Sequence, residues 1–314
     1  MPLDPQAEMV LEISAALGFP PNHTVSPEQA RANYRARARP RGPEVAQAVD
    51  QSIPGPDVPV PVRIYTPQGR GPFPALVWCH GGGWVVGDLD GADATARHLT
   101  VGANCVVVSV DYRLAPDAKF PGPLEDCYAV TRWVASNAAG LNVAPGQIAV
   151  GGDSAGGNLA AAVAMLVRDR GVAAPVFQLL VYPATNRDFG TASYRDNAEG
   201  YQLTRDTMIW YWNHYLRNDA DAANPYAAPL QATDLRHLPP ALVITAEYDP
   251  LRDDGEAYAR RLEQAGIPTV CTRYQGMIHG FFGMSAAIDQ GKQAIDQASR
   301  ALREAFAASV VSGG

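Results

Sequence analysis

Apolar positions along most of the chain alternate between two periods. Short runs rich in Val, Leu and Ile predict strands at Ala75–Cys79, Cys105–Val110, Gln147–Val150, Val176–Val181, Ala241–Thr245 and Thr269–Tyr274. Longer segments with apolar residues three or four positions apart predict helices at Ala92–Val101, Leu124–Ala138, Ser154–Arg168, Arg252–Ala265 and Lys292–Phe306. Strands that are apolar throughout and alternate with helices are typical of a mostly parallel sheet covered on both faces. We therefore expect an α/β fold.

The N-terminal segment differs from this pattern. Met9, Ile13 and Leu17 recur every four residues and indicate one face of an amphipathic helix. A second helix is expected to begin at Pro27, with Ser26 as its N-cap. These two helices precede the first strand signal, so we interpret them as an addition to the sheet domain.

Two further segments modify the alternation. The proline-containing, alternating run from Val58 to Tyr65 predicts an edge strand near the start of the sheet. Residues 185–235 are too many for one crossover helix, and within them Met208, Trp212 and Tyr215 fall on one helical face. Packing of the insertion onto the sheet explains such aromatic residues. The alternative is that the insertion helps to cover the ends of the strands, where α/β sheets bind their ligands.

The expected domain organisation follows from these segments. Residues 46–184 and 236–314 form the α/β catalytic domain, and residues 1–45 and 185–235 form a helical cap. No internal repeat divides the chain further.

Composition and charge exclude several classes of function. The 314 residues contain 25 Lys and Arg against 32 Asp and Glu, a net charge of −7, so nucleic acid is not an expected partner. We expect no membrane span, because the longest apolar stretch is about half of the ~20 residues that one needs. The acidic start lacks the features of a signal peptide, and no pair of the four cysteines has C-x-x-C spacing. We therefore expect reduced thiols in the cytoplasm, and neither a metal nor another cofactor.

The strongest chemical signal is Gly152-Asp153-Ser154-Ala155-Gly156, a G-x-S-x-G pattern. It lies between a predicted strand and a predicted helix, the setting that a nucleophile elbow requires. Glycines on either side allow the tight turn, and the helix N-terminus favours a developing negative charge at Ser154. A helix N-cap in an ordinary turn is the alternative role for this serine.

A second signal is the glycine run in His80-Gly81-Gly82-Gly83-Trp84, directly after a predicted strand. Acyl transfer needs backbone N–H donors where the carbonyl oxygen becomes an oxyanion. We predict that Gly81 and Gly82, together with Ala155, supply these donors, and that His80 anchors the loop. A flexible loop or a phosphate-binding nest is the alternative, although no P-loop pattern follows.

A serine nucleophile also needs a base and a carboxylate that orients the base. His279 follows the last predicted strand, on the same edge of the sheet as Ser154, and Asp249 follows the strand before it. The order Ser154, Asp249, His279 is the one that α/β-hydrolases use. Asp249 before a proline also suits a helix N-cap, and Glu247 is a rival orienting residue. Asp253 is expected to support the loop.

Five motifs in sequence order resemble those of the bacterial hormone-sensitive-lipase-like esterases, the arylesterase and acetyl-hydrolase branch of the α/β-hydrolase fold. They are His80–Trp84, Asp111–Pro116, Gly152–Gly157, Asp249–Asp253 and His279–Phe281. The resemblance implies a carboxylesterase for small-molecule esters with short to medium acyl chains, with Ser154, Asp249 and His279 as its triad. It also implies a helical cap and a homodimer formed through the last strand and its helix.

Two other functions fit the same motifs. An amidase or deacetylase uses the same triad, and only the fit of the leaving group distinguishes it from an esterase. A small-molecule receptor can also share the scaffold, although such relatives have lost a triad residue. The three candidate residues here are all present, which favours an enzyme.

Overall fold

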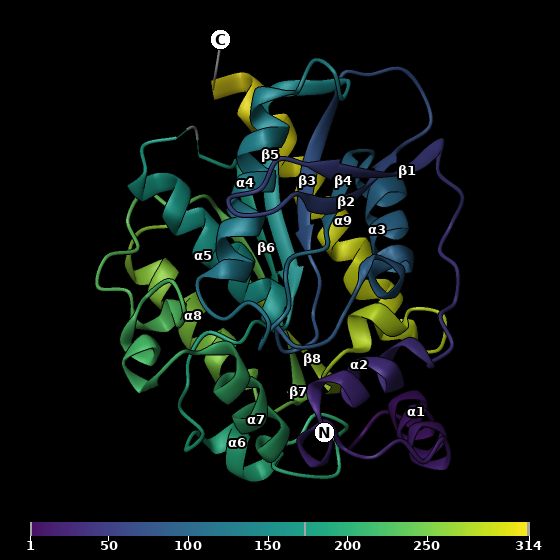
Figure 1. Ribbon diagram of the computed structural model, residues 1–314. Coiled ribbons are helices and arrows are strands. Elements are labelled where there is room, and N and C mark those ends of the chain that lie inside the picture. The colour runs from purple at the N-terminus through teal and green to yellow at the C-terminus, as the bar shows by residue number, and fades with distance from the viewer. Residues whose placement is uncertain (1, 173, 313–314) are drawn as a thin grey trace.

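A single sheet of eight strands passes through the centre of the molecule (Figure 1). The computed structural model describes residues 2–172 and 174–312, and in this part of the chain the strand order is β1-β2-β4-β3-β5-β6-β7-β8. The strands are β1 Gln47–Ile53, β2 Val60–Thr66, β3 Phe73–Cys79, β4 Val106–Val110, β5 Val143–Asp153, β6 Phe177–Val181, β7 Ala241–Tyr248 and β8 Thr269–Ile278. The β2 strand is antiparallel to β1 and β4, and all pairs from β4 to β8 are parallel. The predicted mostly parallel sheet is confirmed.

Helices cover both faces of this sheet (Figure 1). They are α1 Pro5–Ala16, α2 Pro27–Arg35, α3 Leu89–Ala103, α4 Gly122–Ser136, α5 Ala155–Asp169, α6 Ala192–Asp196, α7 Arg205–Tyr215, α8 Arg252–Gln264 and α9 Asp289–Ser312. Short 3-10 turns lie at Asn22–Thr24, Asp219–Ala223, Pro229–Gln231 and Phe281–Met284. Each strand and helix expected in the sheet domain is present, with ends that differ by a few residues.

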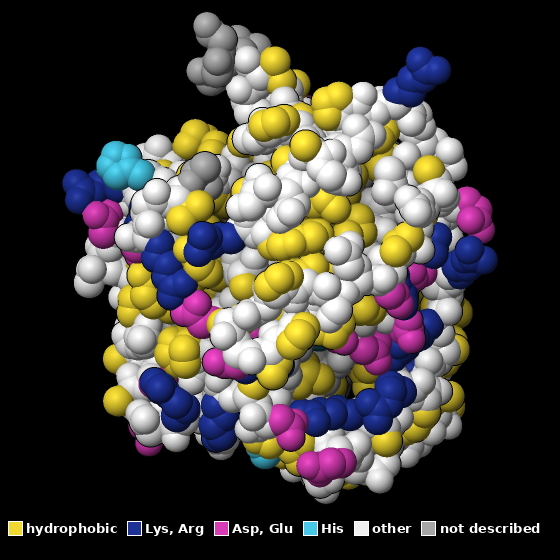
Figure 2. All heavy atoms as spheres, turned by 45° about the horizontal axis from the view of Figure 1, so that its top comes forward, with side chains coloured by type: hydrophobic (Ala, Val, Ile, Leu, Met, Phe, Trp, Pro, Cys, Tyr) yellow, Lys and Arg dark blue, Asp and Glu magenta, His cyan; other side chains and the backbone are white. Residues whose placement is uncertain are grey.

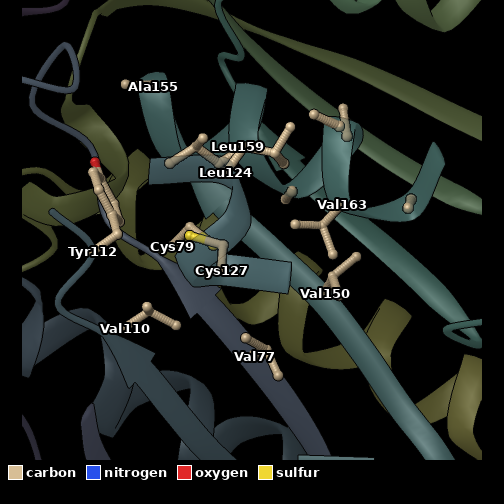
Figure 3. Packing of buried hydrophobic residues seen from close by; sticks show 14 of the residues in the cluster. Val77, Cys79, Val110, Tyr112, Leu124, Cys127, Val150, Ala155, Leu159 and Val163 are labelled. Carbon is tan, nitrogen blue, oxygen red and sulfur yellow. The ribbon is translucent and has the colours of Figure 1, made fainter. Parts of the chain in front are cut away.

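Alternate residues of β3 show how the core is divided between the two faces. Val77 and Cys79 pack with buried residues of α4 and α5, whereas Leu76 and Trp78 pack with those of α3 and α9. Figure 3 shows Cys79 close to Cys127 of α4 on the first of these faces. Because successive side chains of a strand point to opposite faces, a strand covered on both sides must be apolar at every position. The continuous apolar run in β3 has this cause.

The prediction of an edge strand at Val58–Tyr65 is wrong in its position. The segment forms β2, which lies inside the sheet, and the edge is the preceding strand β1. In β1 only Ile53 is buried, so its sequence carries no apolar signal. Pro61 is tolerated in β2 because its carbonyl, which accepts from the Asp111 N–H at 3.0 Å, is the one backbone group that it needs to pair on that side.

The helices outside the sheet domain gather at one end of the molecule. Figure 1 shows α1, α2, α6 and α7 near the lower ends of β7 and β8. The N-terminal segment contacts α7 directly, because Asn22 Nδ2 donates to the Tyr211 hydroxyl at 2.6 Å. A second contact joins His23 Nδ1 and Thr207 Oγ1 at 2.9 Å. Two segments far apart in the sequence are therefore held together.

Helix α1 forms as predicted, but its apolar row does not enter the core. Met9, Ile13 and Leu17 share one face and are 45%, 55% and 57% exposed, respectively. The buried residue of this helix is Ala7. In α2, the predicted Ser26 cap is present, since its Oγ accepts from the Gln29 N–H.

Charged side chains are mixed over the end of the molecule where α9 stops. Figure 2 shows Lys and Arg interspersed with Asp and Glu on this face, and not gathered into one basic field. Searched over the described residues, no helix is long and apolar enough to cross a bilayer.

Candidate active site

Ser154 lies at a sharp turn between β5 and α5, in a backbone conformation that side chains rarely adopt, with φ 56° and ψ −118°. A Cβ at position 152 would collide with the carbonyl oxygens of Gly156 and Cys79, and a Cβ at 156 would also meet the Cys79 carbonyl. Close approach of three backbone segments therefore explains both glycines. Strain of this kind is found where a structure must present one side chain in a fixed direction.

The helix-capping alternative for Ser154 does not describe its hydroxyl. The residue occupies the N-cap position of α5, but its side chain makes no capping hydrogen bond. Its Oγ instead lies 2.9 Å from Nε2 of His279. The side chain is thus held by the imidazole, and the first amides of α5 remain open to a ligand.

The other nitrogen of the His279 ring, Nδ1, lies 2.7 Å from Oδ2 of Asp249. His279 follows β8, and Asp249 follows β7, so both arrive at the same edge of the sheet as Ser154. The structure thereby brings together the three residues selected from chain order alone. The arrangement fixes the imidazole at both nitrogens, as proton transfer from a serine requires.

Asp249 combines the two roles that the sequence left as alternatives. Its carboxylate is fully buried; Oδ2 faces His279, while Oδ1 accepts from the Leu251 N–H at 2.8 Å. One oxygen therefore fixes the turn before α8 and the other is free to orient the imidazole. Asn197 donates from Nδ2 to the backbone carbonyl of Asp249 at 3.2 Å, which adds support from the insertion.

The two other acidic residues near this turn contact the backbone of other segments. Glu247 Oε2 accepts from the Gly276 N–H at 2.7 Å, and Asp253 Oδ2 accepts from the Ser193 N–H at 2.8 Å. Neither hydrogen bond involves His279. Asp253 ties α8 to the start of α6, which is the loop support expected of it.

The glycine loop after β3 corrects one predicted donor. The Gly81 N–H donates to Oδ1 of Asp153 at 3.0 Å, so this amide is already engaged. The N–H groups of Gly82 and Gly83 have no hydrogen-bond partner among the described residues. Both have positive φ, 120° and 59°, which favours glycine. Three glycines in a row predicted a turned backbone, but the spacing could not say which amide faces the side chain before Ser154.

Asp153 is a site residue that the sequence reasoning overlooked. It is the variable residue of the G-x-S-x-G pattern, and burial raises the pKa of its carboxyl to about 6, although the Gly81 N–H and the charge of His279 act in the opposite direction. Because Asp153 precedes Ser154 and binds Gly81, it joins the nucleophile turn to the glycine loop. A carboxylate between two glycine-rich turns was the available signal.

The glycine loop is also covered by the cap helices. The ring of Tyr211 in α7 occupies the place where a Cβ at Gly83 would lie. From α2, Arg31 donates from Nε to the Val85 carbonyl at 2.9 Å and from Nη2 to the Ala115 carbonyl at 2.8 Å. Both helices therefore restrict the backbone that carries the free amides.

His80 supports the base of this loop. It is buried, its ring stacks on Tyr112 with centroids 4.3 Å apart, and its Nδ1 lies 2.7 Å from the Gly81 carbonyl. The Tyr112 hydroxyl donates to the His80 carbonyl at 2.8 Å. Burial lowers the pKa of the imidazole, so the neutral ring suits a structural contact.

Within the described residues, no three His, Cys, Asp or Glu side chains are grouped as a metal ion would require. Comparisons with known proteins agree with this geometry. The sequence pattern of the alpha/beta hydrolase fold family matches residues 76–283. The chain is 40% identical to the carboxylesterase NlhH of Mycobacterium tuberculosis, with 97% of this chain and 96% of the relative covered.

An arylesterase of Saccharolobus solfataricus is 39% identical, covering 90% of this chain and 93% of the relative. Among solved structures, an ester hydrolase from the metagenome of Lake Arreo, in complex with a bipyridine phosphonate derivative, has a TM-score of 0.93. It is 40% identical, and the match covers 97% of this chain and 99% of that one. The chain therefore belongs to the hormone-sensitive-lipase-like esterases of the α/β-hydrolase fold.

Proposed function

We propose that this protein is a carboxylic ester hydrolase for short- to medium-chain acyl esters, with Ser154, His279 and Asp249 as its catalytic triad. The observation that carries the proposal is the continuous chain of contacts at 2.9 Å from Ser154 Oγ to His279 and 2.7 Å from His279 to Asp249. The esterase relatives and the structural neighbours support the same reaction.

In the first half of the reaction, His279 Nε2 takes the proton of Ser154 Oγ as the oxygen attacks the ester carbonyl. The buried Asp249 carboxylate accepts from Nδ1–H, which selects the tautomer with a free Nε2 lone pair and stabilises the imidazolium that forms. Collapse of the tetrahedral intermediate releases the alcohol, which receives its proton from His279. The acyl group remains on Ser154.

In the second half, water attacks the acyl-enzyme with His279 as the base, and Ser154 is regenerated when it recovers a proton from the imidazolium. We propose that the Gly82, Gly83 and Ala155 amides stabilise the oxyanion in both halves. Gly82 and Gly83 are the unengaged amides of the loop, and Ala155 is the first residue of α5, where the helix dipole favours negative charge. Such donors contribute roughly 10²- to 10³-fold each to kcat.

Residues 1–45 and 185–235 form, in this proposal, one cap over the carboxyl ends of the strands. The Asn22–Tyr211 and His23–Thr207 hydrogen bonds between the two segments support a single unit. Contacts of the cap with Gly83 and Val85 support a role in shaping the substrate pocket. A cap that closes the pocket favours monomeric esters with limited acyl length.

We also propose that two copies of the chain associate through β8, in a reducing compartment such as the cytoplasm. The outer side of β8 is the end of the sheet in the described residues, and Val270 on it is 57% exposed. Three of the four cysteines are buried, and all four are free. Light scattering after size-exclusion chromatography tests the dimer, and a monomer at working concentration contradicts it.

The function is tested by initial hydrolysis rates across p-nitrophenyl esters from acetate to palmitate, with Ser154→Ala as the blank. A Ser154-dependent maximum at short or medium chains is expected. Silence across the series from a folded protein contradicts an esterase, and turnover of matched anilides would then identify an amidase.

A further inference from the structure

Tyr182, the first residue after β6, has an unusual backbone for a large side chain. Its φ is 34°, in the left-handed region, and its side chain is 1% exposed. An aromatic residue pays a steric cost for this conformation, which persists only where the surroundings enforce it. The strain therefore points to a constraint on where the ring lies.

The ring of Tyr182 is directed at the base of the proposed triad. Its centroid lies 4.5 Å from that of the His279 ring, with the two planes at 50°, and 6.0 Å from that of Phe281. Burial raises the pKa of the phenol well above its ordinary value, while donors from the Phe282 and Gly283 backbone, close to the phenol oxygen, act in the opposite direction. One side chain thus contacts the imidazole and the turn that follows it.

The backbone of Tyr182 is itself fixed. Its N–H donates to the Ile244 carbonyl at 2.6 Å, on the strand that leads to Asp249. On either side of it, the Ser154 N–H donates to the Val181 carbonyl at 2.8 Å, and the Ala184 N–H donates to the Ser154 carbonyl at 3.3 Å. The residue is therefore held against the nucleophile turn while its ring reaches the histidine.

We propose that Tyr182 is a positioning residue for His279: its ring holds the imidazole between Ser154 and Asp249 and favours the imidazolium that forms during the reaction. An aromatic ring attracts a cation that lies within about 6 Å of its centroid, and desolvation strengthens the attraction. This inference rests on the proposed triad function. It assigns no chemical step to the phenol oxygen.

Every group that faces the imidazole bears on the expected pH dependence. Asp249 contacts Nδ1, Ser154 contacts Nε2, and the carboxyl of Asp153 interacts with the ring through its charge. Substitution at position 182 leaves these three groups in place. Loss of the Tyr182 ring removes a stabilisation of the imidazolium, so the acid limb of the kcat/KM profile should move to lower pH, by roughly half a unit.

The experiment compares Tyr182→Phe, which keeps the ring, with Tyr182→Leu, which removes it at the same strained position. Tyr258→Leu is the matched control, because Tyr258 is also fully buried but makes no ring contact with His279 in the described structure. Kinetics with p-nitrophenyl acetate between pH 5 and 9 are measured alongside thermal unfolding. Should Tyr182→Leu not fold, Tyr182→Met takes its place.

The expected result for Tyr182→Leu is a loss of roughly 10- to 100-fold in kcat, with KM changed less than about threefold, and the shifted acid limb. Tyr182→Phe should stay within about threefold of wild type with an unmoved limb. Equal losses in the Leu and Phe variants, an unmoved limb in the Leu variant, or an equal kcat loss in Tyr258→Leu would each overturn the proposal. Failure of the triad function is separate, since it would appear as activity retained by Ser154→Ala.

Discussion

The ring of Tyr211 occupies the space that a side chain at Gly83 would need, so a cap helix and the glycine loop are packed against each other without a gap for even one methyl group. Gly83 also has a φ of 59°. Both the conformation and the contact therefore require glycine here, and they couple the cap to the proposed oxyanion donors.

Replacing Gly83 by Ala should displace either the loop or Tyr211. Because the Gly83 amide is a proposed oxyanion donor, we expect kcat to fall roughly 10²- to 10³-fold with a smaller change in KM. Steady-state kinetics with p-nitrophenyl acetate check this expectation. Gly69→Ala is a control, since Gly69 also has positive φ, 110°, but has open space around it. A Gly83→Ala enzyme with wild-type kcat would remove the amide from the mechanism.

The hydrogen bond from Asn22 to Tyr211 should couple the two halves of the cap. In a double-mutant cycle with Asn22→Ala and Tyr211→Phe, we expect a coupling free energy of about 1 kcal/mol, because each variant removes one partner of the same bond. Urea unfolding of the four proteins measures it. Strictly additive effects would mean that the two segments do not stabilise one another through this bond.

Asp249→Asn should lower kcat by roughly 10³- to 10⁴-fold, since an amide at this position favours the wrong imidazole tautomer. Glu247→Gln and Asp253→Asn serve as comparisons, because their carboxylates contact backbone amides away from His279. Each of these should retain kcat within about tenfold. A larger loss for Glu247→Gln than for Asp249→Asn would exchange their assignments.

Asp111 provides a test of stability against pH that lies outside the proposed triad. Burial, and then the negative charges of Asp88 and Asp90, raise the pKa of the Asp111 carboxyl to about 6. The native state therefore holds this proton more tightly than the unfolded chain, and the stabilisation is lost as pH rises from about 4 to 6.

Consequently, the free energy of unfolding of Asp111→Asn relative to wild type should increase between pH 4 and 6 and then level off. Denaturant titrations at a series of pH values measure the difference. A difference that is constant over this range would contradict the raised pKa. Asp153 has the same value and is unchanged in both proteins, so its contribution cancels.

Much of this structure could be predicted from the sequence because the informative residues are constrained by several effects at once. The strands from β3 to β8 are apolar since both of their faces are covered, and chain order sufficed to select Ser154, Asp249 and His279. The edge strand β1 was missed because only Ile53 in it is buried, so its pairing depends on backbone groups, which carry no sequence signal.

Other features depend on contacts that spacing cannot reveal. A period of four placed Met9, Ile13 and Leu17 on one face of α1 but could not specify whether any segment covers that face. The glycine run predicted a turned loop, yet the partner of the Gly81 amide depends on the direction of the Asp153 side chain. Such details follow from tertiary packing and not from local pattern.

The central claim is that Ser154 is the nucleophile, and turnover of p-nitrophenyl acetate by Ser154→Ala tests it most directly. The account predicts a fall in kcat of about 10⁴- to 10⁶-fold in a protein whose thermal unfolding matches wild type. Retention of more than about a tenth of wild-type turnover by a folded Ser154→Ala enzyme would contradict it.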